Sequence, residues 1–140
     1  MTILEAIRSY ALDQAAVAAM LADPSGFFVA QAPQKVPRRY VLLHQLGQPG
    51  QHHLGGVSNR TRTAFQLESY ASTREEAVAL DAQLQSTLDG YRGVLTASVW
   101  CHELLKDDCR GPLPIDLQDG DGHPAFVVQT DYHAWHSPRI

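Results

Sequence analysis

The strongest constraint on the fold is a period-2 alternation of residues in two segments, 61–70 and 125–135. In the second segment one set of residues (Phe126, Val128, Thr130, Tyr132 and Ala134) alternates with another (Val127, Gln129, Asp131, His133 and Trp135). Because successive side chains of a strand point to opposite faces, each segment is predicted to be a strand with one apolar face. Two long strands of this kind need a cover over their apolar faces, and a layer of helices supplies one.

A helix from residue 73 to residue 88 is predicted to form this cover. Ser72 or Thr73 is placed to cap its N-terminus, and Glu75 and Glu76 follow in the first turn, where the helix dipole favours acids. Apolar residues then recur at helical spacing: Ala77, Leu80, Leu84, Leu88 and Tyr91. We expect the core to contain the following residues: Ile3, Ile7, Phe65, Leu67, Leu80, Leu84, Leu88, Phe126, Val128 and Tyr132.

Two further helices are predicted at the start of the chain. Thr2 and Glu5 have the spacing of a capping box, which marks the beginning of the first helix. Asp13 is expected to cap a second helix over residues 14–21, where alanines favour helix. The sequence Asp-Pro-Ser-Gly at 23–26 is expected to end it.

The remaining strands are predicted at 27–30, 39–46 and 94–104. Two long loops are expected, one over 47–59 at the tip of a hairpin and one over 106–124. This order predicts a single α+β domain spanning all 140 residues. Its sheet is expected to be antiparallel or mixed, with four to five strands, two to three helices on one face and a long hairpin extension.

The composition predicts a soluble, intracellular protein with one core. Apolar residues make up 44% of the chain and charged residues 19%, which argues against disorder. No apolar run reaches the ~18 residues of a membrane span, and Glu5 and Arg8 interrupt the first apolar stretch, which argues against a signal peptide. Two cysteines are too few for a disulfide framework.

The net charge of −4 is unevenly distributed along the chain. Residues 24–67 contain no acid, whereas residues 103–121 contain six acids and two cations. The charged residues of interest are Lys35, Arg38, Arg39, Arg60 and Arg62 in the first stretch and Asp107, Asp108, Asp116, Asp119 and Asp121 in the second. They form either two solvated surfaces or a pair of complementary contact surfaces. His52 and His53, in the expected hairpin tip, are interpreted as contact residues.

Neither the histidines nor the cysteines have the spacing of a metal site. His133 and His136 lie three apart on a predicted strand, so their side chains point to opposite faces. The Asp-Gly repeat at 119–122 resembles part of a calcium loop, but Leu117 and Val128 stand where that loop needs acids. We expect no metal and no cofactor.

No motif of nucleophilic, phosphate-binding or dinucleotide-binding enzymes is present. Cys101 or Cys109 paired with a histidine leaves open a small α+β enzyme or ligand-binding domain as an alternative. A nucleic-acid-binding protein is a further alternative, disfavoured by a sequence pI of 5.9. We therefore expect that the protein is not an enzyme.

Several segments occur in an order and spacing that together suggest a family. They are the opening helix ILEAI at 3–7 followed by DQAAV at 13–17, the loop at 32–33, the strand RYVLL at 39–43, the strand TAFQLESYA at 63–71 leading into the helix 73–88, LDGYRG at 88–93, and the closing YHAWH at 132–136. In these the chain resembles the small tail completion, or tail terminator, proteins of long-tailed bacteriophages and phage-like particles. The stretch from Cys109 to His123 departs from the family in being longer and more acidic.

This resemblance implies a structural virion protein whose α+β subunits form a ring, commonly a hexamer, on the head-proximal end of the tail tube. The ring would end tube growth and join the tail to head-completion or connector proteins, with DNA only passing through its lumen. It implies a place in the virion tail or neck, with assembly in the host cytoplasm and no membrane contact. The charged residues and histidines named above are then expected at subunit or tube interfaces.

Overall fold

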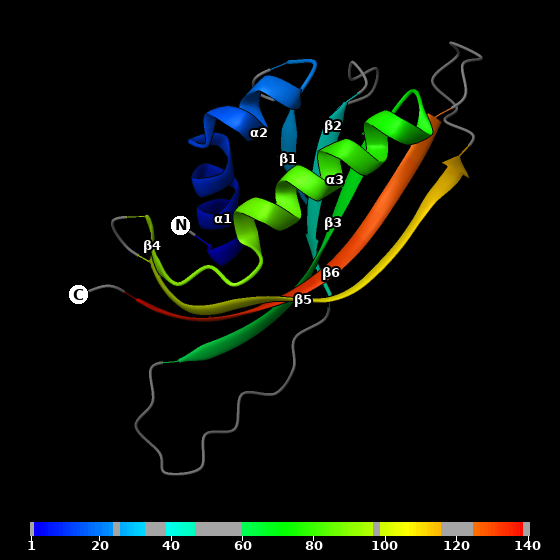
Figure 1. The fold of residues 1–140 in the computed structure, drawn as a ribbon. Helices are drawn as coiled ribbons and strands as arrows, with labels where there is room; N and C mark the ends of the chain where they lie inside the picture. Colours follow the sequence, from blue (N-terminus) through cyan, green and yellow to red (C-terminus); the bar gives the residue numbers. More distant parts are fainter. Residues whose placement is uncertain are drawn as a thin grey trace.

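A computed structural model of the chain describes residues 2–23, 26–32, 39–46, 60–96, 99–115 and 125–138. Figure 1 shows the arrangement of their helices and strands. The elements, in chain order, are α1 (Ile3–Leu12), α2 (Ala15–Met20), β1 (Phe27–Val29), β2 (Tyr40–Gln45), β3 (Thr61–Ala71), α3 (Arg74–Leu88), β4 (Gly93–Thr96), β5 (Val99–Ile115) and β6 (Ala125–Pro138).

The described strands form one curled sheet of six strands in the order β1-β2-β3-β6-β5-β4. Neighbouring strands are antiparallel, except that β1 runs parallel to β2. The expectation of a mixed α+β sheet is confirmed, but the expected four to five strands are too few. The segment predicted as one strand over 94–104 divides into β4 and the beginning of β5, which raises the number to six.

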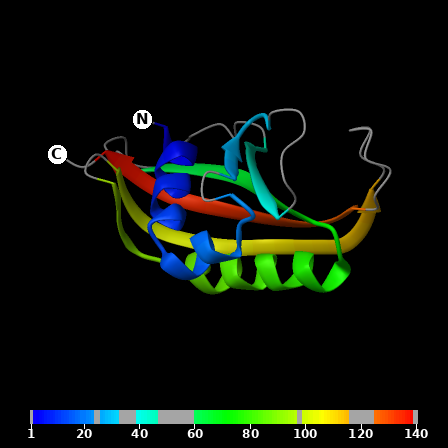
Figure 2. The ribbon, with the colours of Figure 1, turned by 90° about the horizontal axis from the view of Figure 1, so that it is seen from above.

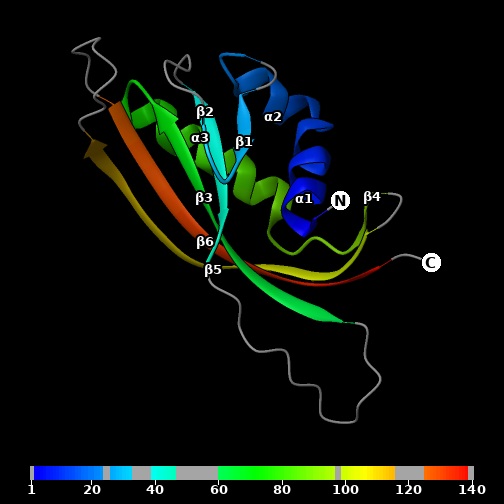
Figure 3. The same ribbon diagram turned by 180° about the vertical axis from the view of Figure 1, so that it is seen from behind.

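All three described helices lie on one face of the sheet (Figure 1). Seen from above in Figure 2, β3, β6 and β5 run the length of the molecule and α3 lies alongside them. Figure 3 shows the opposite face, on which no described helix lies. We call this the open face.

The core lies between the helices and the inner face of the sheet. The even-numbered residues of β6 from Val128 to Ala134 are buried, as the alternation predicts. On α3 the apolar residues predicted to face the sheet are buried, namely Ala77, Leu80, Leu84 and Leu88. The helix packs against β3, β6 and β5. Ile3 and Phe126, expected in the core, are only partly buried.

The predicted caps of α1 and α3 are confirmed. Thr2 and Glu5 form a reciprocal capping box, and Thr73 Oγ1 accepts a hydrogen bond from the backbone N–H of Glu76 at 3.1 Å. The predicted cap of α2 is wrong. Asp13 instead ends α1, because its backbone N–H donates to carbonyls of that helix, and Gln14 precedes α2 without a side-chain cap.

The predicted loop over 106–124 is wrong for its first ten residues, which continue β5 as far as Ile115. This stretch is rich in Asp, Gly and Pro, which strands disfavour. Pairing with β6 overrides that local preference, and two register irregularities within the stretch, between Lys106 and Asp108 and between Arg110 and Leu113, accommodate the poorly fitting residues. The predicted pairing of the strands flanking 47–59 is confirmed by the antiparallel register of β2 and β3, while 47–59 and 116–124 lie outside the described residues.

We predict that Leu84→Ala lowers the free energy of unfolding by about 2–5 kcal/mol, because it leaves a cavity where the side chain is fully buried. Val78→Ala on the same helix is the control, since Val78 is 47% exposed and should cost little. Chemical denaturation of the two variants and the wild type measures both effects. Equal losses from the two variants would contradict the assigned buried face of α3.

Candidate functional site

Polar side chains on the open face form a hydrogen-bonded network across four strands. Paired residues on neighbouring strands share a face, and this places the even-numbered residues of β3 beside the odd-numbered residues of β6. We call this set the open-face network, and its members are His44 on β2, Gln66, Glu68 and Tyr70 on β3, Gln129, Asp131 and His133 on β6, and Asp107, Asp108 and Arg110 on β5.

Glu68 is the first of four carboxylates in the network, and only 13% of its side chain is exposed. It accepts hydrogen bonds from Tyr70 Oη at 2.9 Å and Gln129 Nε2 at 3.2 Å, and His44 Nε2 lies 2.9 Å from its Oε1. Burial is the main cause of a raised pKa for Tyr70, and the negative charge of Glu68 and its hydrogen bond with the phenol raise the pKa further. The phenol therefore stays protonated and donates to the carboxylate.

Asp131 is the second carboxylate, and Arg110 holds it through two guanidinium hydrogen bonds. Arg110 Nη2 lies 2.9 Å from Oδ1 of Asp131 and Nη1 lies 3.1 Å from Oδ2, an arrangement that planar guanidinium groups favour. Gln66 Nε2 adds a bond at 2.9 Å. The hydrogen bonds from Arg110 are the main cause of a lowered pKa for Asp131.

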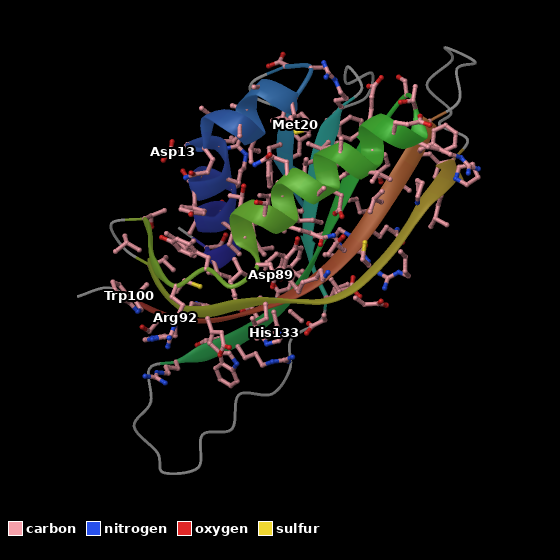
Figure 4. All side chains as sticks on the ribbon, in the orientation of Figure 1. Asp13, Met20, Asp89, Arg92, Trp100 and His133 are labelled. Atoms are coloured by element: carbon pink, nitrogen blue, oxygen red, sulfur yellow. The ribbon has the colours of Figure 1, made fainter. Side chains whose placement is uncertain are left out.

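Two acids expected at a subunit interface make contacts within the chain. Asp107 carboxylate oxygens lie 2.8 and 3.0 Å from Nδ1 of His133, and Asp108 Oδ2 lies 2.9 Å from Nη1 of Arg110. Figure 4 shows His133 beside the lower stretch of β5 and β6. Both acids therefore belong to the open-face network.

Basic residues that share the acid-free stretch 24–67 of the sequence lie at opposite ends of the sheet in the structure. Arg39 precedes β2 at the end of the sheet where Tyr40 pairs with Tyr70, and its Nε lies 3.8 Å from a carboxylate oxygen of Glu76. Arg62 pairs with Trp135 at the opposite end of β3. The other residues expected at an interface lie outside the described residues: Lys35, Arg38, His52, His53, Asp116, Asp119 and Asp121.

The opposite end of β3 gathers a cluster of basic and aromatic residues. We call it the basic–aromatic end, and its members are Arg60, Arg62, Arg92, Trp100 and His102. Arg92 Nε donates to the His102 carbonyl at 3.0 Å, and the His102 ring lies 2.8 Å from the Ser137 hydroxyl. Figure 4 places Arg92 and Trp100 close together where β4 meets β5.

Burial, followed by the positive charges of Arg60 and Arg92, lowers the pKa of His102. The ring is therefore neutral at pH 7, and the positive charge at this end comes from arginine. Sequence reasoning missed Arg92, Trp100 and His102 as site residues because they are far from Arg60 along the chain. The register of β3, β6 and β5 brings them together.

Of the two cysteines, Cys101 lies in an environment that does not suit nucleophilic chemistry. Burial raises the pKa of Cys101 to about 11, so its thiol stays protonated at neutral pH. Cys109 Sγ lies 3.7 Å from a carboxylate oxygen of Asp81, itself buried and accepting from the Thr130 hydroxyl at 2.7 Å. Cys109 therefore belongs to a hydrogen-bonded cluster with Asp81 and Thr130.

Within the described ranges, no three His, Cys, Asp or Glu side chains are grouped so as to hold a metal ion. None of the helices in the same ranges has the length and apolar character needed to cross a membrane.

The fold has a counterpart among solved structures. It is similar to a chain of the structure described as "Virion of native gene transfer agent (GTA) particle", with a TM-score of 0.66 over 96% of this chain and 94% of that chain. The two sequences are 15% identical, so the likeness establishes a shared fold and no function by itself. No protein-family model and no curated protein matches the chain.

We predict that Arg110→Gln raises the pKa of Asp131 toward the ordinary aspartate value, because it removes the hydrogen bonds that lower it. A carboxyl with a lowered folded-state pKa adds stability above its unfolded pKa, and this stability is lost as the pH falls through the folded value. The stability difference between wild type and Arg110→Gln should therefore shrink at acidic pH. NMR titration and denaturation at several pH values measure the two effects.

Lys106→Gln is the control for this experiment. Lys106 lies on the same strand, and its ammonium group donates to Gln85 rather than to the network. An Asp131 pKa that responds equally to both substitutions would contradict the assigned pairing with Arg110.

Proposed function

We propose that the protein is a structural component of a phage-like virion and that its subunits form a ring, in hexameric form, on the head-proximal end of the tail tube. The ring ends the growth of the tube and joins it to head-completion or connector proteins. DNA only passes through the lumen, and the role involves no catalysis. The observation that carries the proposal is the likeness of nearly the whole fold to a chain from a gene transfer agent virion.

The sequence resemblance supports the same proposal on separate grounds. It rests on the order of short segments along the chain, whereas the structural likeness rests on the arrangement of the whole chain in space. The two agree on a phage-like particle, and the resemblance adds the place within it. Because the identity with the structural neighbour is only 15%, the place in the tail is the part that needs a direct experiment.

The edge along β1, and the edge of β5 beyond β4, favour contacts through ends and faces rather than through added strands. On β1, the carbonyl of Phe27 accepts from Arg8 and that of Val29 accepts from the N–H of Gln31. Such occupied groups are not available to pair with another strand.

The outer edge of β5 beyond β4 is occupied in a similar way. The Leu104 carbonyl accepts from the N–H of Gly90 at 2.7 Å, and the N–H of Lys106 donates to Asp89 at 2.9 Å. Farther along, Pro112 and Pro114 have no N–H to offer. A ring built from these subunits would therefore use the loops, ends and open face as contacts, which gives each subunit two different surfaces.

We predict that deletion of the gene in the source organism yields tails of uncontrolled length that are not joined to heads, because the cap that stops the tube is missing. Electron microscopy of the released particles measures the tail lengths, and complementation with the wild-type gene is the control. Labelling of the protein in wild-type particles should place it at the head–tail junction. Tails of normal length, joined to heads, after deletion would overturn the proposal.

A further inference from the structure

A second polar network lies on the inner side of the sheet, where α3 runs alongside β5 and β6 (Figure 2). Its helix residues are spaced four apart, so they share one face of the helix. We call this network the inner seam, and its members are Asp81, Gln85 and Asp89 from α3 and its C-cap, Lys106 and Cys109 from β5, and Thr130 and Tyr132 from β6.

Asp81 is the carboxylate at the centre of the inner seam, and only 4% of the residue is exposed. The Thr130 hydroxyl donates to its Oδ1 at 2.7 Å, and the Gln85 amide donates to its Oδ2. The Cys109 thiol lies 3.7 Å from the same Oδ2. A carboxylate offers about four acceptor positions, so these contacts leave room for a further donor.

The phenol of Tyr132 is buried in the inner seam and has no hydrogen-bond partner among the described residues. Burial raises the pKa of Tyr132, and the charges of Asp81 and Asp89 raise it further. The phenol is therefore protonated at neutral pH and has a proton to donate. An unsatisfied hydroxyl in the interior costs free energy, and buried polar groups of folded proteins almost always have a partner.

The position of Tyr132 in the sheet places it between the two carboxylates of the seam. Thr130, two residues earlier on the same face of β6, donates to Asp81. Lys106, the β5 partner of Tyr132, donates its backbone N–H to Asp89 Oδ1 at 2.9 Å. Figure 4 shows Asp89 at the end of α3, close to β5 and β6. The phenol nevertheless has no direct hydrogen bond to either carboxylate.

We propose that the inner seam binds an internal water molecule, which accepts a hydrogen bond from Tyr132 Oη and donates one to the Asp81 carboxylate. Water fits this place because it accepts from one group and donates to another, and the two protein groups to be joined are a donor and an acceptor. Internal waters typically make about three hydrogen bonds to polar groups that protein atoms leave unsatisfied. The inference goes beyond the tail role and does not depend on it, since it concerns how one subunit is held together.

The water completes the contacts that hold α3 to a part of β5 whose sequence favours a loop. Lys106 and Cys109 lie in the stretch 106–115, which pairs as a strand against its local preference. Their side chains reach the helix through Gln85 and Asp81. The water joins β6 to the same carboxylate, so that the helix is tied to both strands by directional contacts.

A metal ion fits the inner seam less well than water does. No three metal-ligating side chains are grouped in the described part of the chain. A protonated phenol is a hydrogen-bond donor, whereas a cation needs lone pairs from every group around it.

The first test compares Tyr132→Phe with the wild type in chemical denaturation. If a water satisfies the phenol, removal of the hydroxyl loses a hydrogen bond, and the equilibrium constant for unfolding should rise about fivefold. If the phenol is unsatisfied, the substitution removes a buried group that has no partner, and the constant should stay the same or fall. The second result would overturn the inference.

Ser69→Ala is the matched control for Tyr132→Phe. The Ser69 hydroxyl is also buried and without a partner among the described residues, but its neighbours on β2 and β6 are Val41 and Val128. These side chains offer no hydrogen bond to a water, so the unfolding constant of Ser69→Ala should not rise. Equal losses of stability from the two variants would contradict a specific role of the inner seam.

A double-mutant cycle tests whether Tyr132 acts through Asp81. Asp81→Leu keeps a similar shape and removes the acceptor, so adding Tyr132→Phe to it should change the unfolding constant by less than about twofold. Effects of the two substitutions that simply add would overturn the bridge, because the phenol and the carboxylate would then act independently.

A crystal structure of the wild type tests the bridge directly. It should show a water at about 2.7 Å from both Tyr132 Oη and a carboxylate oxygen of Asp81, and this water should be lost or displaced in Tyr132→Phe. A phenol bonded directly to the carboxylate, or a metal ion between the two groups, would overturn the assignment. None of these outcomes bears on the tail role, which deletion of the gene tests separately.

Discussion

The pairing of β3 with β6 is the interaction on which the rest of the structure depends. Their register is continuous over eleven residues, from Thr61 opposite His136 to Ala71 opposite Phe126. On the inner face, the Phe65 and Tyr132 rings stack with centroids 5.4 Å apart, and α3 covers them. A shift by one residue would turn every buried side chain toward the open face, so the hydrophobic cover of α3 holds the register in place.

The same register organises both candidate surfaces. On the open face it aligns Gln66 with Asp131 and Glu68 with Gln129, so that polar side chains satisfy one another across strands. At its end it brings Arg62 beside Trp135 and, through β5, close to His102. Within the open-face network, Glu68, Asp107, Asp108 and Asp131 each have an ion-pair or hydrogen-bond partner in the same network.

Local sequence patterns predicted much of the architecture, and their failures have identifiable causes. The alternation in 125–135 and the stripe from Ala77 to Leu88 correctly predicted which faces are buried. The caps at Thr2 and Thr73 were predictable because a cap depends on residues within one turn. The prediction failed at Asp13 and along 106–115, where an element's extent depends on its partner: β6 extends β5 through residues that would otherwise favour a loop.

The sequence by itself determined the α+β class, the buried faces of the long elements and the uneven charge, because all three follow from residue periodicity and composition. Only the tertiary structure decided which charges act together. It placed Arg39 and Arg62 at opposite ends of β3. Asp107 and Asp108 form ion pairs within the chain, and Arg60 and Arg92 lie close enough to His102 to lower its pKa. Electrostatic interactions fall off over a few ångströms of solvent, so they depend on distances in space that strand register sets and spacing along the chain does not.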